Sequence, residues 1–115
     1  VLHRHPHIDI CLSHAGGTMT SLIGRFNRAC TKRPWVPEHL QYEGAFEESL
    51  QKLWFDTHVH DPRVLNWVID IMGTNKLLLG TNFAGWDQHA MTQDVPPELA
   101  LKMADNAKHL LRVST

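Results

Sequence analysis

Polar residues with useful chemistry stand at or near the ends of three apolar segments of the chain. They are His14 at the end of residues 8–14, Asp56, His58 and His60 within 53–60, and Asn82 within 75–83. Imidazole is the usual acid–base group near neutral pH and the commonest metal ligand. In parallel α/β folds the carboxyl ends of the strands line the active site. Three equivalent strand ends therefore favour a functional site, although strand ends that emerge into water are polar in any protein.

Two glycines directly follow His14 in the stretch HIDICLSHAGGT, residues 7–18. Gly16 and Gly17 allow a tight turn and a close approach of the backbone to a ligand. They also precede a predicted helix, whose first amide groups can hold an anion such as a carboxylate. The alternative is a plain turn between a strand and a helix.

The remaining histidines give weaker indications of a site, although nine in 115 residues is a high number. The stretch HRHPH, residues 3–7, resembles a metal motif, but it precedes the first strand and we interpret it as solvent-exposed. His39, His89 and His109 belong to no cluster and are predicted to lie on the surface. His58 and His60 have the same parity on one strand and therefore face the same way. A complete site of three or four metal ligands is not visible in the sequence.

Strand and helix patterns alternate three times along the chain, which predicts a parallel sheet with crossover helices. The predicted strands are 8–14, 53–60 and 75–83, and the predicted helices are 18–30, 61–73 and 96–113, with a further helical stretch at 46–53. Thr18 is a plausible N-cap of the first helix. Asp61, Pro62 and Gly73 mark the second by a cap, a proline at the first position and a stop. Residues 31–46 and 84–95 are predicted loops, the former with one short helical turn.

Composition restricts the class of protein. The formal net charge is −1 and the basic residues form no stripe, so nucleic acid is not expected as a partner. No apolar run is long enough to span a membrane, and no signal peptide is visible. Cys11 is expected to be a buried small hydrophobic residue, and with Cys30 it makes no disulfide framework, so a cytoplasmic location is expected. Motifs of serine hydrolases, phosphate loops and CxxC pairs are absent from the sequence.

Three stretches in order carry a family resemblance: residues 5–29 with SHAGG and IGRF, residues 54–83 with VHDP and LGTNF, and residues 105–111. They resemble the C-terminal third of the amidohydrolase-2 group, and within it the aminocarboxymuconate-semialdehyde decarboxylase-like enzymes. The resemblance implies a (β/α)8 barrel, of which residues 1–115 form a single segment with strands six, seven and eight and their helices. It also suggests a truncated product or gene fragment that begins inside the preceding helix.

The resemblance also implies roles for individual residues. His14 matches the catalytic histidine that hydrogen-bonds the metal-bound water and acts as acid and base. Arg25 matches an arginine that binds a substrate carboxylate, in some members across a dimer interface, and an arginine fork suits that group. His60 matches a family histidine near the end of strand seven, whose role is left open. Gly16 and Gly17 would let the substrate approach the backbone.

The chain departs from the family pattern at Asn82, where the decarboxylases place a metal-binding aspartate. A neutral amide is a weaker zinc ligand than a carboxylate, so metal binding through this residue should be weakened. Asp87, five residues further on, is a possible substitute. The other metal ligands of the family, an HxH motif on strand one and a histidine on strand five, have no counterpart in this chain.

The resemblance therefore implies a metal-dependent decarboxylase, with zinc or a similar divalent ion, acting on a small unsaturated or aromatic carboxylic acid. A hydrolase, lactonase or hydratase with weak or no metal is the alternative that Asn82 favours. A third alternative is an inactive fragment that pairs with another copy, because half a barrel leaves open strand edges and an apolar face.

Overall fold

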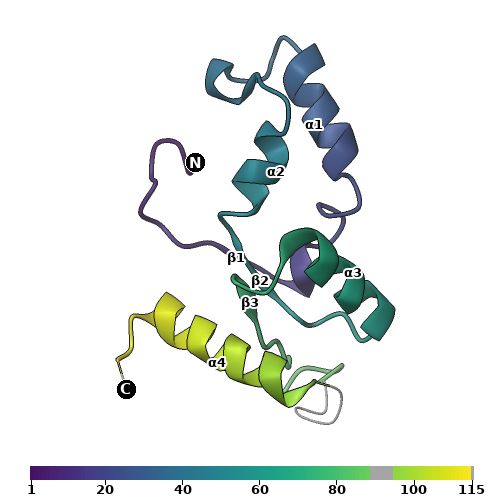
Figure 1. Cartoon of the computed structure of the whole chain (residues 1–115), viewed down its shortest axis with the longest axis vertical. Coiled ribbons are helices and arrows are strands. Elements are labelled where there is room, and N and C mark those ends of the chain that lie inside the picture. Colours follow the sequence, from purple (N-terminus) through teal and green to yellow (C-terminus); the bar gives the residue numbers. More distant parts are fainter. Residues whose placement is uncertain (89–94, 115) are drawn as a thin grey trace.

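The computed structural model describes residues 1–88 and 95–114, and at its centre is a parallel three-stranded sheet (Figure 1). The strands are β1 (Cys11–Leu12), β2 (Trp54–Asp56) and β3 (Leu77–Leu78). Their order in the sheet is β1-β2-β3, with Leu12 paired to Phe55 and Phe55 paired to Leu77. Parallel neighbours need crossover connections, and helices supply them.

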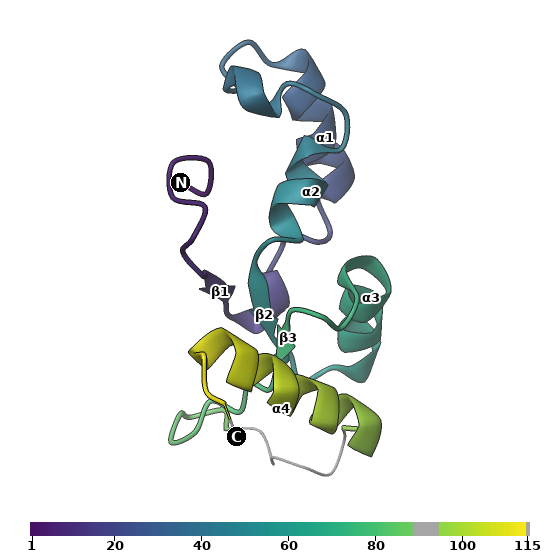
Figure 2. The same cartoon turned by 60° about the vertical axis from the view of Figure 1, so that its left-hand side comes forward.

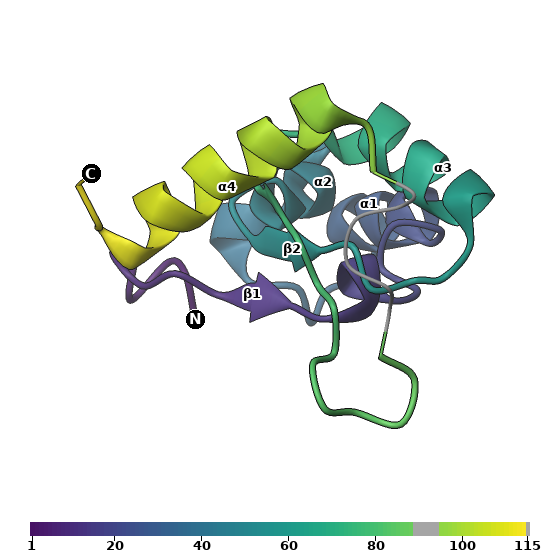
Figure 3. The same ribbon diagram turned by 90° about the horizontal axis from the view of Figure 1, so that it is seen from below.

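Four α-helices accompany the sheet: α1 (Ile23–Lys32), α2 (Ala45–Leu50), α3 (Pro62–Met72) and α4 (Pro97–Leu111). Two short 3₁₀ helices, η1 (His14–Gly16) and η2 (Glu38–Leu40), follow β1 and α1. Helices α1 and α2 lie side by side beyond one end of the sheet (Figures 1 and 2). Seen from below, α3 and α4 lie on the same side of the sheet, and the segment after β3 extends away from them (Figure 3).

The main core lies between the sheet and the helices. Phe55 and Leu77 from adjacent strands meet Leu50 of α2 and Met103 of α4, and all four side chains are buried. A second, smaller cluster of Cys30, Val36 and Ala45 joins α1 to α2. The main cluster fixes the strands relative to the helices, and it therefore also fixes the loops that leave their carboxyl ends.

All three predicted strands are present, but each is shorter than predicted. The strand predicted over 8–14 pairs only at Cys11–Leu12, because η1 begins at His14 with a positive φ of 54° and turns the chain out of the sheet. Pairing of β2 ends at Asp56 and pairing of β3 at Leu78. An apolar run predicts which residues can be buried. Which of them form backbone hydrogen bonds in a sheet depends on where a neighbouring strand lies.

Two predictions near the first helix are wrong. Helix α1 begins at Ile23 instead of residue 18, because Gly16 and Gly17 both have positive φ and a turn closes from Leu22 N to Thr18 O at 3.2 Å. Thr18 is therefore not its N-cap. Cys11 is exposed, since the described residues leave its face of the sheet uncovered; the prediction had assumed a strand buried on both faces.

The other helix predictions are confirmed. In α3, the Asp61 carboxylate accepts a hydrogen bond from Arg63 N at 2.9 Å, Pro62 is the first residue, and the helix ends before Gly73, whose φ is 72°. Helix α4 lies within the predicted range 96–113, and α2 and η2 correspond to the predicted helical stretch and turn. The predicted loop 84–95 lies partly outside the described residues. Among the helices of residues 1–88 and 95–114, none has the length and apolar character needed to cross a membrane.

Candidate active site at the carboxyl end of the sheet

The chain leaves each strand of the sheet through a residue in the left-handed region of the backbone. These residues are His14 after β1, His60 after β2 and Asn82 after β3, with φ values of 54°, 54° and 48°. Such conformations cost free energy in non-glycine residues and accumulate at functional sites. The three left-handed residues therefore indicate that the carboxyl end of the sheet is a candidate functional site.

Asp56 holds two of these exits together. Its Oδ1 atom accepts hydrogen bonds from the backbone N–H groups of Ala15 and His58, both at 3.1 Å. On the other side, Gly80 N donates to Thr57 Oγ1 at 3.1 Å, which joins β2 to the segment after β3. A side chain at Gly80 would lie 2.9 Å from Asp56 Cβ, so this close approach requires glycine.

Two histidines after β2 share one carboxylate oxygen from the loop after β3. His58 Nε2 lies 3.0 Å from Asp87 Oδ2, and His60 Nε2 lies 3.4 Å from the same atom. The exposed fractions of the three side chains are 5% for His58, 45% for His60 and 20% for Asp87. We call these three residues the His–Asp cluster.

Asn82 orients the carboxylate of the His–Asp cluster. Its Nδ2 atom donates a hydrogen bond to Asp87 Oδ1, which leaves Oδ2 facing the two histidines. Burial raises the pKa of Asp87, but the hydrogen bonds from Asn82 and His58 outweigh it and lower the pKa below its ordinary value. Asp87 is therefore a carboxylate at neutral pH.

His14 lies beside the His–Asp cluster. Its ring centroid is 5.6 Å from that of His58, and the His58 and His60 centroids are 4.6 Å apart. His14 is exposed, whereas the Nδ1 atom of His58 is buried with no hydrogen-bond partner among the described residues. The structure places His14, His58, His60 and Asn82 close together at this end of the sheet.

The other predicted site residues lie apart from this cluster or have a packing role. Arg25 is exposed on α1 and forms no hydrogen bond or ion pair within the described part of the chain. At Gly16 a side chain would come within 2.7 Å of the Phe55 ring, so this glycine allows β1 and β2 to pack closely. Gly17 has no atom within 4 Å of the corresponding position, so its side is open.

Sequence reasoning gave too little weight to Asp87 and His58. From the sequence, Asp87 could be named only as a substitute for a carboxylate at position 82. The residues around it in the sequence do not show that this loop returns to the end of β2. The shared parity of His58 and His60 on the predicted strand was the available indication; β2 ends at Asp56, before both residues, yet both rings reach Asp87. Donors of this set, two imidazoles and a carboxylate, are those that zinc takes in catalytic sites.

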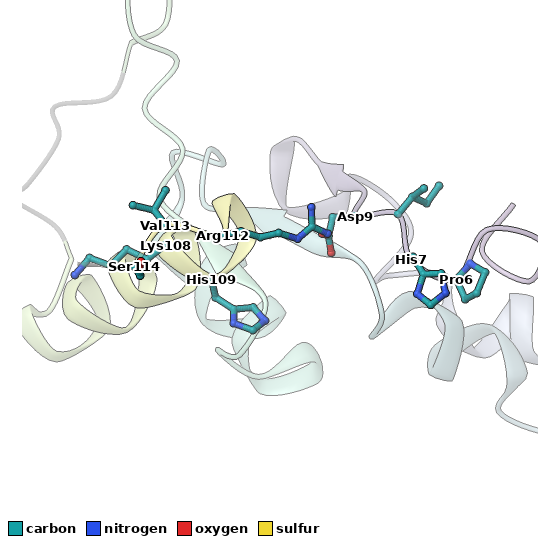
Figure 4. A pocket seen from close by; sticks show the side chains of 9 residues that line it. Pro6, His7, Asp9, Lys108, His109, Arg112, Val113 and Ser114 are labelled. Atoms are coloured by element: carbon teal, nitrogen blue, oxygen red, sulfur yellow. The ribbon is translucent and has the colours of Figure 1, made fainter.

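A pocket lies at the amino end of the sheet, away from the His–Asp cluster (Figure 4). It has a volume of about 460 Å³ and is lined by the segment before β1 and the last turn of α4. Arg112 extends toward Asp9 across it, at 3.3 Å, and Lys108 and His109 belong to the same helix turn. We call it the amino-end pocket; none of the residues singled out from the sequence as site residues lines it.

Comparisons with known proteins identify the family. A family model described as amidohydrolase matches residues 1–111. The curated 2-amino-3-carboxymuconate-6-semialdehyde decarboxylase of Dictyostelium discoideum is 31% identical over 83 residues, which are 72% of this chain and 23% of that protein. The Caenorhabditis elegans protein of the same name is 29% identical over 87 residues, covering 72% of this chain and 20% of its own length.

A solved structure shows the same fold. The 5-carboxyvanillate decarboxylase of Sphingomonas paucimobilis superposes with a TM-score of 0.77 over 98% of this chain and 36% of that protein, at 18% identity. The chain thus spans about a quarter of the length of the curated relatives it matches. With a family model that covers residues 1–111 and a sheet whose polar strand ends converge, the chain belongs to the amidohydrolase family.

Proposed function

We propose that the protein to which this chain belongs is a decarboxylase acting on a small unsaturated or aromatic carboxylic acid. The observation that carries the proposal is His14, a family-matched histidine, lying beside the His–Asp cluster at the carboxyl end of the sheet. The similar proteins from Dictyostelium discoideum and Caenorhabditis elegans are both named as decarboxylases of a carboxymuconate semialdehyde.

The proposed architecture is part of a (β/α)8 barrel, in which β1, β2 and β3 are strands six, seven and eight. The parallel order of the sheet and the likeness to a 5-carboxyvanillate decarboxylase over 98% of this chain support it. In such barrels the active site lies at the carboxyl ends of the strands, where His14, His60 and Asn82 leave the sheet.

Decarboxylation breaks the bond between a carbon and its carboxylate, releases carbon dioxide and leaves that carbon in need of a proton. We assign the delivery of this proton to His14, whose imidazole is exposed beside the His–Asp cluster and can carry a transferable proton. Arg25 would bind a carboxylate of the substrate, Gly17 would leave room beside the backbone, and Gly16 would hold that turn against Phe55. His60 would border the substrate site from the neighbouring exit after β2.

The proposed cofactor is a divalent metal ion, with zinc as the first choice. When bound, such an ion supplies Lewis-acid polarisation of a substrate oxygen or of water. The donor types present at the strand ends suit it, whereas Asn82 offers only a neutral amide. The side chains of this chain then have the remaining tasks: to orient the acid, to exclude water and to hold the transferable proton.

The test is a decarboxylase assay on this chain and on the product of the complete reading frame that contains it. Carboxymuconate semialdehyde and carboxyvanillate are incubated with each protein, and carbon dioxide release is measured. The substitution His14→Asn should lower kcat by about 10²- to 10⁴-fold, the usual contribution of a positioned acid or base. Absence of carbon dioxide release from both proteins with both acids would contradict the proposal.

A hydrolase or lactonase with weak or no metal is the second candidate, and Asn82 is the observation that favours it. Its amide nitrogen is directed at Asp87, so the position contributes no carboxylate of its own. Hydrolysis of small lactones, unaffected by a chelator and unaccompanied by carbon dioxide release, would establish this candidate in place of the decarboxylase.

We further propose that the chain self-associates and functions in the cytoplasm. Phe83, Trp86 and Trp35 are largely exposed, and an apolar groove of about 340 Å³ runs between β3 and α4. Exposed apolar surface of this kind marks contact sites. Size-exclusion chromatography tests the proposal, and a clean monomer contradicts it.

A further inference from the structure

We propose that the His–Asp cluster is by itself a complete three-ligand site for a divalent transition-metal ion of the zinc class, bound through His58 Nε2, His60 Nε2 and Asp87 Oδ2. The three ligand atoms all lie within 4.8 Å of one another. None of the family matches assigns a metal to these residues. The site is a property of this chain and stands whether or not the protein is a decarboxylase.

The spacing of the donor atoms suits a tetrahedral ion. With metal–ligand bonds of about 2.0–2.1 Å, two ligands of a zinc tetrahedron lie roughly 3.3 Å apart. The distances from Asp87 Oδ2 to the Nε2 atoms of His58 and His60 are 3.0 and 3.4 Å. Small rotations of the side chains therefore suffice to place an ion between them.

His58 has the character of a functional histidine rather than a core residue. Its side chain is 5% exposed, its Nε2 atom faces Asp87, and Nδ1 is buried without a partner among the described residues. The backbone of His58 is fixed by its hydrogen bond to Asp56, so the ring is directed before any ion arrives.

Asn82 acts on the metal through Asp87, as a positioning residue. Its hydrogen bond to Asp87 Oδ1 leaves Oδ2 available to the cluster. Partners of this kind orient a ligand and tune its affinity. Asn82 therefore acts on the carboxylate of Asp87 and not on the ion itself.

Three protein ligands leave a fourth position of a tetrahedral ion open, as catalytic zinc sites do. The His14 ring lies 5.6 Å from the His58 ring, so it borders the cluster without being one of its ligands. By contrast, within residues 1–88 and 95–114 no second group of three such donors occurs. The HRHPH stretch is exposed and is not part of such a group.

Metal binding to the full 115-residue chain tests the proposal. After removal of metal with a chelator, zinc is titrated by calorimetry and cobalt(II) is followed by its visible absorption. We expect one ion per chain and the intense bands of tetrahedral cobalt. Asp87→Asn and His60→Ala should each weaken binding by on the order of 100-fold, and Asn82→Gly by about 10-fold with the cobalt bands retained.

His5→Ala is the matched control, because it removes a histidine of the HRHPH stretch and leaves the cluster intact; it should bind like the wild type. Circular dichroism of each variant separates loss of ligand from loss of fold. Wild-type affinity in folded Asp87→Asn or His60→Ala, or loss of binding in His5→Ala, would overturn the site. Metal binding without decarboxylation would reject the proposed function alone, and decarboxylation without binding at the cluster would reject the site alone.

Discussion

The two ends of the sheet contain the same kinds of residue but arrange them differently. At the carboxyl end, His58 is buried and shares the Asp87 carboxylate with His60, and the backbone is left-handed at three strand exits. At the amino end, Asp9 pairs with the exposed Arg112 at 3.3 Å and accepts a hydrogen bond from Trp54 Nε1 at 3.1 Å, and Arg112 is left-handed as the C-cap of α4.

This difference shows that composition alone does not make a site. Histidine, carboxylate and basic groups line the amino-end pocket as well. At the carboxyl end, a buried histidine shares one carboxylate oxygen with a second histidine, beside three left-handed strand exits, and such surroundings shift the properties of a group. A pocket lined by polar groups is therefore not by itself sufficient to indicate a functional site.

The largest expected effect is on the packing that supports the carboxyl end. Gly16→Ala adds a Cβ atom 2.7 Å from the Phe55 ring at a residue with φ of 82°, and should lower the free energy of unfolding by about 3 kcal/mol. Gly17→Ala meets backbone strain only and should cost about 1 to 2 kcal/mol. Urea denaturation of both variants measures the difference, and equal losses would show that the contact with Phe55 is not tight.

A smaller effect is expected from Asp61, which begins α3 just after the β2 exit. Hydrogen bonding from Arg63 lowers its pKa from 3.8 to about 2. Its contribution to stability is therefore complete above about pH 4 and is lost as the pH falls toward about 2. Asp61→Asn keeps the cap but removes the charge, so its melting temperature should fall less between these pH values. Parallel acid dependence in both proteins would contradict this.

The smallest effect is expected at the amino end. Arg112→Ala removes the exposed pair with Asp9 and should change the free energy of unfolding by less than about 0.5 kcal/mol. The zinc affinity of the cluster should not change. A loss above about 1 kcal/mol, or weaker metal binding, would show that the two ends are coupled.

Much of the fold follows from local sequence patterns. The α3 boundaries are encoded by three residues, Asp61, Pro62 and Gly73, and they agree with the structure. The strand lengths and the exposure of Cys11 depend on which residues lie across the sheet, and no local pattern contains that information. Helix α1 begins late for the same kind of reason, because the turn after Gly17 competes with helix formation.

Only part of the candidate site could be predicted from the sequence. His14, His60 and Asn82 stand at strand ends, and parallel strands bring such ends together. The contact between His58 and Asp87 joins residues 29 apart through the segment after β3, whose path depends on tertiary packing. Arg25 remains a prediction, since the described contacts do not connect it with the cluster.

The left-handed residues at the three strand exits also affect how variation in this family should be interpreted. Positions 14, 60 and 82 admit glycine, asparagine or histidine far more readily than valine or isoleucine, whatever chemistry takes place nearby. A mutational scan scored only for folded protein should already show strong selection there. Restricted variability at these positions therefore reports the geometry of the chain as well as catalysis, and the two are separated only by comparing a folding score with an activity score at each position.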